Sequence, residues 1–232
     1  MRRGGLVFIA GIAASLLLLT AGLTGVIRLT AGDRTLMERE MLRYAPPAET
    51  LLPEGEYGGV AAMITGYLTG DVQDFGYRFT DEAGIMYECF HDYEAAHMAD
   101  CRALIRPAAG VCICCLAAAA VLLAAALYGA GADRRIRFAD GMLAGCCAFG
   151  ILTAVLTVWG LADFSSLFLA FHRAAFRNDL WLLNPATDLL IRLMPVRFFT
   201  ALILRGLVCF LVWAALILVL TRMLRGRKTH EV

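Results

Sequence analysis

The sequence predicts an all-α membrane protein with four transmembrane helices, and two observations support this prediction. Of the 232 residues, 60% are hydrophobic, which is typical of a membrane protein and too high for a soluble domain. The hydrophobic residues also gather into four runs, each long enough for the roughly 20 residues that a bilayer-crossing helix needs. We expect spans at residues 5–27, 108–130, 139–161 and 199–220, within a single integral membrane domain covering residues 1–232.

Basic residues predict which ends of the spans face the cytoplasm, because clusters of Arg and Lys stay on that side of the membrane. Three clusters fall on one side if the chain crosses four times: Arg2 and Arg3; Arg134, Arg135 and Arg137; and Arg222, Arg225, Arg227 and Lys228. The sequence therefore predicts a multi-pass protein of the cell membrane with both termini in the cytoplasm and outer connections at residues 28–107 and 162–198. The first span is expected to remain as an anchor, because its apolar stretch exceeds the roughly 7–15 residues of a signal-peptide core.

Charge and cysteine placement narrow the possible partners. The formal net charge is +1, so the chain offers no bulk basic field for nucleic acid. Six of the eight cysteines lie within apolar runs, where they act as small hydrophobes, and the stretch "CICC" lacks the converging polar ligands of a zinc site. Cys89 and Cys101 lie outside the runs, and the sequence leaves open whether they pair.

The first outer connection is predicted to form a mainly helical extracytoplasmic domain. A short helix is expected to start near Asp33, a favourable N-cap, and to stop at the pair of prolines that follows it. A second helix is expected over residues 58–70, and alternating aromatic residues with a glycine-containing turn predict a small hairpin within residues 73–87. A third helix is expected to start near Asp92 and to run into the second span, with a weak point at Pro107.

The start of this third helix carries a polar stripe. Glu94, His97 and Asp100 are spaced three residues apart, so a helix places them on one face. A carboxylate beside an imidazole raises the pKa of the ring and fixes its tautomer, which suits a general base. The alternative is an exposed helix with ordinary ion pairs and a surface histidine.

The second outer connection is predicted to form an interfacial helical hairpin. Its aromatic residues suit the headgroup depth of a bilayer, and the pair Asn184-Pro185 is expected to break its first helix. Its polar residues gather around a second histidine: His172, Arg173, Asn178, Trp181 and Asp188. A plain structural hairpin is the alternative, but it does not require these residue types together at the membrane surface. Both His97 and His172 are predicted on the outer side.

Two stretches of the chain resemble the signatures of a family of small four-span bacterial membrane proteins, some of which are lipoprotein intramolecular transacylases of Gram-positive bacteria. The stretch "FHDYEAAHMADCRAL" matches the first signature at Phe90, Glu94, His97, Met98, Asp100 and Leu104. Residues 171 to 199 match the second at Phe171, His172, Phe176, Asn178, Trp181, Asn184, Pro185, Asp188, Leu190, Ile191, Leu193, Pro195, Phe198 and Phe199. The departures are His91 in place of Ser or Thr, Tyr93 in place of Arg, and Cys101 in place of Val.

This resemblance implies an acyltransferase that works on a diacylated lipoprotein in contact with membrane lipid. The sn-2 acyl chain of the diacylglyceryl group moves to the α-amino group of the same N-terminal cysteine and leaves a lyso-lipoprotein. The reaction needs a base, an oxyanion stabiliser and an acid, but neither a soluble cofactor nor a covalent acyl-enzyme. Acyl chains are expected in grooves beside small residues such as Gly141, Ala144 and Gly145.

The resemblance also assigns roles to the polar residues of the outer connections. His97 is the principal general acid and base, oriented by Glu94 or Asp100. His172 positions the substrate, stabilises the oxyanion or shares the proton transfer. The remaining polar and interfacial supports are Arg173, Asn178, Trp181 and Asp188.

Two other classes of protein fit the same residues. One is a non-enzymatic membrane assembly or sensor protein with an acidic outer domain. The other is a metal-dependent membrane hydrolase that uses His97, His172 and carboxylates, although no H-E-x-x-H motif is present. The distance between the two histidines decides whether they form one shared site or belong to two unrelated sites.

Overall fold

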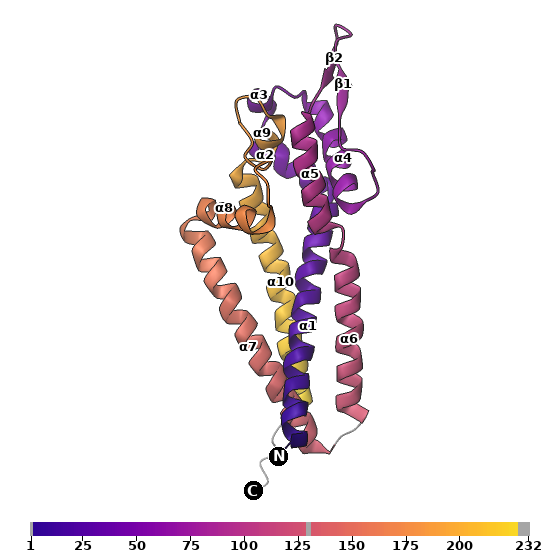
Figure 1. The fold of residues 1–232 in the computed structure, drawn as a ribbon, viewed down its shortest axis with the longest axis vertical. Coiled ribbons are helices and arrows are strands. Elements are labelled where there is room, and N and C mark those ends of the chain that lie inside the picture. Colours follow the sequence, from indigo (N-terminus) through magenta and orange to yellow (C-terminus); the bar gives the residue numbers. More distant parts are fainter. Residues whose placement is uncertain (1, 129–130, 227–232) are drawn as a thin grey trace. The chain divides into compact units, whose positions relative to one another are not determined.

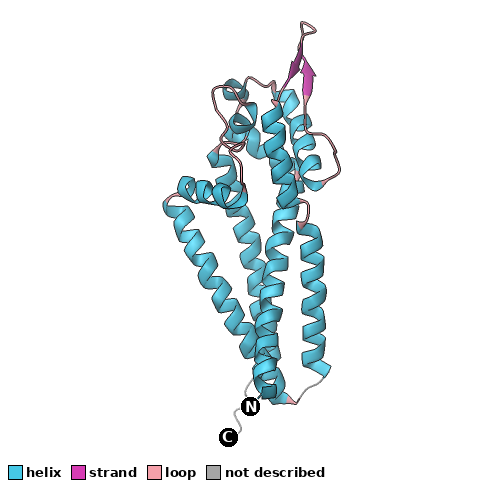
Figure 2. Ribbon diagram, viewed as in Figure 1, coloured by secondary structure: helices cyan, strands magenta, loops and turns pink. Residues whose placement is uncertain are grey.

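The computed structural model describes residues 2–128 and 131–226. Helices dominate the fold (Figure 2), so the predicted all-α class is confirmed. Among the described residues, four helical segments are long and apolar enough to cross a membrane. They are α1 (Arg2–Gly32), α6 (Ala108–Tyr128) with α5 (Asp92–Ile105) leading into it, α7 (Ala132–Ala162) and α10 (Val196–Arg225), labelled in Figure 1. Residues 129–130 of the predicted second span, and Arg227 and Lys228 of the last basic cluster, lie outside the described residues.

Three of the described membrane helices, α1, α7 and α10, extend beyond the predicted apolar spans. Apolar runs mark where a helix enters lipid, whereas the helix itself ends only where a cap or a proline interrupts the backbone hydrogen bonds. Thus α1 continues until Asp33, which caps the next helix, and α7 continues until Asp163, whose carboxylate accepts the backbone N–H of Ser166 at 3.0 Å. Helix α10 begins directly after Pro195.

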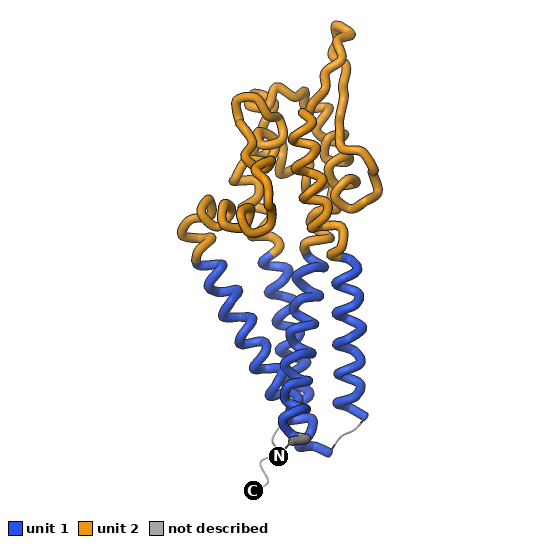
Figure 3. Tube along the Cα trace, viewed as in Figure 1, with its two compact units in different colours: residues 1–26, 109–158, 207–232 blue, residues 27–108, 159–206 orange. Residues whose placement is uncertain are grey.

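Packing divides the chain into two compact units, coloured separately in Figure 3. Unit 1 comprises residues 1–26, 109–158 and 207–232, and unit 2 comprises residues 27–108 and 159–206. The long helices α1, α7 and α10 contribute several residues to each unit, and α6 contributes its first residue, Ala108, to unit 2 and the rest to unit 1.

Small residues hold the helices of unit 1 close together. A Cβ atom added to Gly141 would clash with the carbonyl oxygen of Phe8, and one added to Gly145 would clash with the hydroxyl of Ser15. Such glycines allow the backbones of two membrane helices to approach closely. The prediction that Gly141 and Gly145 leave room for acyl chains is therefore wrong, because α1 already fills the space beside them.

An apolar cavity of about 490 Å³ lies farther along α7. It is bounded by α7, α10 and one residue of α1, Leu19, and two threonines, Thr153 and Thr157, are among its few polar side chains. The remaining lining includes Gly150, Ala154, Phe210, Leu211 and Leu218. This cavity matches the size and apolar character of a ligand pocket.

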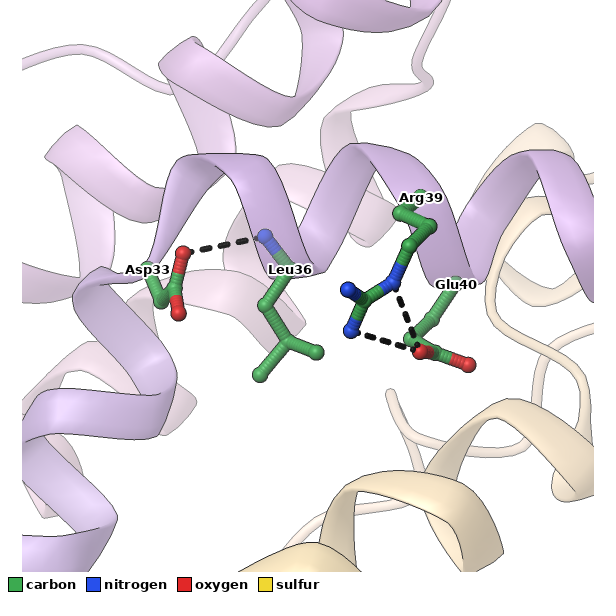
Figure 4. Close-up of polar contacts among 4 residues, drawn as sticks. All are labelled: Asp33, Leu36, Arg39 and Glu40. Carbon is green, nitrogen blue, oxygen red and sulfur yellow. Dashed lines mark hydrogen bonds and ion pairs between the residues drawn. The ribbon is translucent and has the colours of Figure 1, made fainter.

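Unit 2 begins with the helical domain expected from the first outer connection. It contains α2 (Arg34–Tyr44), α3 (Pro47–Thr50), the 3-10 turn η1 (Glu54–Glu56) and α4 (Tyr57–Thr69). The predicted N-cap is confirmed, because the carboxylate of Asp33 accepts the backbone N–H of Leu36 at 2.9 Å (Figure 4). In the same view, Arg39 forms an ion pair of 3.1 Å with Glu40.

Helix α4 supplies the centre of the hydrophobic core of unit 2. Three of its side chains are fully buried: Tyr57, Val60 and Ile64. They belong to one cluster with Met41 of α2 and Met98 of α5. Because α4 contacts both α2 and α5, its glycine-rich and largely apolar sequence forms the layer on which the two more polar helices pack.

The predicted hairpin is also present. Strands β1 (Arg78–Thr80) and β2 (Met86–Glu88) pair antiparallel, with Phe79 opposite Tyr87. These two rings stack with their centroids 5.2 Å apart, as cross-strand aromatic pairs do.

The second outer connection contains two short helices, as expected, but the first ends early. Helix α8 (Phe164–Ala175) stops at Phe176, whose backbone is extended, well before the expected break at Asn184. The segment after it turns instead on Asn178, whose side-chain oxygen accepts the backbone N–H of Leu180 at 3.1 Å. Helix α9 (Leu189–Leu193) then leads to α10.

Candidate active site

His97 lies on α5, and hydrogen bonds hold the first turn of this helix in place. His91 occupies the N-cap position, and its backbone N–H donates to a carboxylate oxygen of Glu94 at 2.7 Å. One face of α5 is buried, and it carries Glu94, His97 and Met98. The fold therefore buries His97, which excludes the alternative of an exposed surface histidine.

The two histidines lie together within unit 2. The rings of His97, from α5, and His172, from α8, have centroids 6.2 Å apart. Each residue is only 7% exposed. The tertiary structure thus brings the two polar stretches of the outer connections to one place, which supports a single shared site.

Aromatic rings and one backbone carbonyl fix the position of His172. The centroids of Phe168, Phe176 and Trp181 lie 4.0, 5.5 and 5.3 Å from that of the imidazole. The Nδ1 atom lies 2.7 Å from the carbonyl oxygen of Phe168. A carbonyl can only accept a hydrogen bond, so Nδ1 carries the proton and Nε2 keeps its lone pair. Burial lowers the pKa of His172, which keeps the ring neutral.

His97 is held differently. Its Nε2 atom lies 3.6 Å from the thiol sulfur of Cys101, one helical turn away, and its Nδ1 atom is buried without a partner among the described residues. The ring meets that of Phe176 edge-on at 5.2 Å. Burial and the nearby His172 lower the pKa of His97 to about 4, and the opposing effect of Asp100 is weaker.

The expected arrangement of carboxylates around His97 is therefore wrong in two respects. Within the described part of the chain, no carboxylate bonds to either ring nitrogen of His97. The pKa of the ring is lowered, not raised, because desolvation outweighs the charge of Asp100.

Asp100 instead connects α5 to the second outer connection. Its carboxylate accepts the side-chain N–H of Asn178 at 2.8 Å. The backbone carbonyl of Asn178 in turn accepts the indole N–H of Trp181 at 2.8 Å, and the indole lies against His172. These three predicted support residues thus form a bridge that ends at the imidazole.

Glu94 and Asp188 form a second polar cluster, one turn of α5 away from the histidines. The second oxygen of Glu94 accepts the backbone N–H of Leu190 at 2.8 Å, so each oxygen of this fully buried carboxylate holds an amide. Asp188 accepts the hydroxyl of Tyr93 and the backbone N–H of Asn184. Burial would raise the pKa of Asp188, but these hydrogen bonds and that from Thr187 lower it.

Other candidate groups lie outside the pair of histidines. The side chain of Arg173 is exposed. Cys89 and Cys101 are both free thiols. Among the described residues, no three His, Cys, Asp or Glu side chains converge as they would around a metal ion.

Comparison with protein families decides what kind of protein carries this site. The model of the family described as lipoprotein intramolecular transacylase Lit matches residues 12–199, a stretch that includes both histidines. The chain belongs to the Lit family. The resemblance inferred from the two signatures is thereby confirmed, and this integral membrane protein is an acyltransferase. Membership does not favour the assembly, sensor or hydrolase alternatives.

Solved structures of a Lit protein share the fold. The in meso structure of lipoprotein intramolecular transacylase Lit from Bacillus cereus matches with a TM-score of 0.74 at 16% identity, over 95% of this chain and 96% of that one. Two structures of the same enzyme, with one histidine replaced by arginine or by alanine, match with TM-scores of 0.70 at 16% identity. They cover 96% of this chain and 93% and 94% of theirs. Comparison with curated protein sequences gives no match.

Sequence reasoning about this Lit member missed three residues that touch the histidines. Phe168 was expected only as one of the interfacial aromatic residues, Phe176 only as a match to the second signature, and Cys101 only as a departure from the first signature and a possible partner of Cys89. Each lies four residues from a histidine on the same chain segment, at the spacing of neighbours on a helix. That spacing is the signal that could have found them.

Proposed function

We propose that the chain moves the sn-2 acyl chain of a diacylglyceryl-cysteine lipoprotein to the α-amino group of the same cysteine. The observation that supports this most directly is the buried pair of neutral histidines, whose ring centroids lie 6.2 Å apart, with one ring nitrogen of each lacking a partner among the described residues. An intramolecular transfer needs two such nitrogens at a single reacting centre. One handles the proton of the amine, and the other stabilises the oxygen of the ester.

His172 is suited to be the base. Its Nδ1–H is held by the carbonyl of Phe168, so the lone pair of Nε2 has a fixed direction. The lowered pKa keeps this lone pair available at neutral pH. This assignment exchanges the roles predicted from the sequence, in which His97 was the principal base.

In the proposed reaction, one proton moves from the amine to His172 and then to the glyceryl oxygen. The neutral α-amine attacks the carbonyl carbon of the sn-2 ester, and Nε2 of His172 takes a proton from the nitrogen. The tetrahedral oxyanion forms beside His97, and the bond to the glyceryl oxygen then breaks. That oxygen takes the proton back from His172, so the products are an amide and a free hydroxyl. No water and no covalent enzyme intermediate take part.

The other site residues support this pair in two ways. Asp100, Asn178 and Trp181 form the bridge that ends against His172. Glu94 and Asp188 hold α5 to the second outer connection through hydrogen bonds. We assign all five to positioning, and Arg173, whose side chain is exposed, to contact with headgroups or substrate at the surface.

We also propose that unit 2 faces the outside of the cell and that both termini are cytoplasmic. Both segments predicted to lie outside, residues 28–107 and 162–198, fall within unit 2. Diacylated lipoproteins present their modified cysteine at the outer leaflet, so this orientation places the histidines on the substrate's side. The apolar cavity of unit 1 supports the expected contact with membrane lipid, because an acyl chain matches its lining.

The experiment is expression of the full chain in a bacterium whose own lipoproteins remain diacylated. Mild alkaline hydrolysis cleaves esters and spares amides, so mass spectrometry of the N-terminal lipopeptide should find one base-stable acyl chain. A mixture of two lipopeptides that differ in peptide and in acyl isotope label should show no exchange of acyl chains between peptides. Lipopeptides that lose every acyl chain in base, despite good expression of the protein, would overturn the proposal.

A further inference from the structure

Cys101 is the unusual neighbour of the site. It lies on α5 one turn after His97, and its sulfur is 3.6 Å from Nε2 of that ring. The second observation is on the opposite edge of the imidazole, where Nδ1 has no partner among the described residues although His97 is only 7% exposed. A buried polar atom without a partner costs free energy and points to a group that binds there.

The hydrogen bond between the two side chains has a favoured direction. Burial raises the pKa of the Cys101 thiol to about 12, so the sulfur carries its proton. Sulfur is only a weak acceptor, whereas the bare nitrogen of a neutral imidazole is a good one. The stronger arrangement is therefore S–H donating to Nε2, which leaves the single ring proton of His97 on Nδ1.

We propose that Cys101 is a positioning residue that holds His97 in the tautomer with its proton on Nδ1, so that His97 offers an N–H donor to the ester oxygen of the substrate. The inference rests on the proposed function for the identity of that oxygen. It assigns a role to a residue that the sequence marked only as a departure from the family signature and as a possible partner of Cys89.

The two histidines then complement each other. His172 donates its own Nδ1–H to Phe168 and presents a bare nitrogen, whereas His97 accepts from Cys101 and presents an N–H. One ring can take a proton while the other stabilises negative charge on oxygen. With the opposite tautomer, the lone pair of His97 Nδ1 would face the developing oxyanion and repel it.

The tautomer can be read directly from nitrogen NMR of the full-length protein in detergent, labelled with ¹⁵N-histidine. Shifts separate protonated from bare ring nitrogens, and His91→Asn and His230→Asn leave only the two site rings to assign. We expect Nδ1 of His97 to be protonated in the wild type and mixed in Cys101→Ala. Cys101→Ser, which keeps a hydrogen-bond donor, should restore the wild-type pattern at least in part.

Kinetics give a second readout. We expect Cys101→Ala to lower kcat about 5-fold with KM unchanged, which is the effect of losing one neutral hydrogen bond. Cys89→Ala is the matched control, because Cys89 is also partly buried in unit 2. We expect this variant to keep the wild-type kcat. A purely structural role would instead lower the amount of folded protein and leave the NMR pattern of the folded part unchanged.

Failure of the inference and failure of the proposed function can be told apart. A wild-type His97 protonated on Nε2, or a pattern that is the same in Cys101→Ala, overturns the role of Cys101 whether or not the protein is active. Because the NMR measurement needs no turnover, absence of acyl transfer by the wild type would overturn the proposed function alone. If Cys101→Ala does not fold, the wild-type and Cys101→Ser spectra still decide.

Discussion

Unit 2 contains two buried polar clusters, built around residues one turn apart on α5. They differ in how many of their polar atoms have hydrogen-bond partners. In the first, Glu94 and Asp188 accept hydrogen bonds from backbone amides and from Tyr93. In the second, His97 and His172 each keep one ring nitrogen without a hydrogen-bond partner in the part of the chain that the structure describes. We call them the holding cluster and the histidine pair.

The difference shows how two buried polar clusters of one unit serve different purposes. A buried carboxylate whose two oxygens each accept a backbone N–H fixes the segments that donate to it, and Glu94 is committed to them and not to the imidazole. A buried ring with a free nitrogen lowers stability but stays available for substrate. The holding cluster therefore fixes the frame, and the histidine pair remains for chemistry.

The largest expected effect is on the histidine pair. Replacing His172 by Ala removes the proposed base and should lower the rate of acyl transfer about 10²- to 10⁴-fold. Replacing His97 by Ala removes the proposed oxyanion donor and should cost about 10²- to 10³-fold. Both rates are measured from the base-stable acyl chain of a lipopeptide substrate. His91→Asn, which keeps a good N-cap, should match the wild type, and full activity in either alanine variant would break the comparison.

The next effect concerns Glu94 in the holding cluster. Glu94→Ala leaves the buried amide of Leu190 without an acceptor, at about 1–3 kcal/mol, and also removes the acceptor of the part-buried amide of His91. We expect a clear loss of unfolding free energy, measured by thermal unfolding in detergent, and a smaller loss in Glu94→Gln, which keeps one acceptor. If Glu94→Gln instead abolished transfer at unchanged stability, Glu94 would belong with the histidine pair.

Stability should also depend on pH through His97. Its pKa in the folded protein is lowered to about 4, so between the unfolded value of about 6.5 and that point the unfolded chain binds the extra proton. The unfolding free energy should therefore fall as the pH falls through this window, by roughly 3 kcal/mol at about 1.4 kcal/mol per pKa unit. The difference between wild type and His97→Asn in detergent isolates this contribution, and parallel pH curves would contradict it.

The smallest effect is expected at the edge of the holding cluster. Tyr93→Phe removes one hydrogen bond to Asp188, which keeps those from Asn184 and Thr187. Because Tyr93 is 41% exposed and water can replace the lost partner, we expect only a small loss of unfolding free energy. Thermal unfolding measures it, and the transfer rate should not change. A rate loss as large as that of the histidine variants would extend the site to Tyr93.

Local sequence patterns predicted most of the fold. The N-cap at Asp33, the helix near Asp92 and the hairpin before it were all expected, because caps, turns and periodicity act over a few residues. The early end of α8 was not expected, since the segment after Ala175 turns on Asn178 and that residue also bonds to Asp100 of α5, 78 residues away in sequence. Patterns over a few consecutive residues cannot predict such a long-range contact.

The sequence by itself determined the membrane class, the four spans, the family and the two histidines, because hydrophobic length and short motifs are written in consecutive residues. Only the tertiary structure decided the roles around those histidines. It placed Glu94 on two backbone amides, Asp100 on Asn178 and Cys101 on His97. The physical reason is that burial and hydrogen-bond partners set the pKa and tautomer of an imidazole, and both depend on segments brought together by folding.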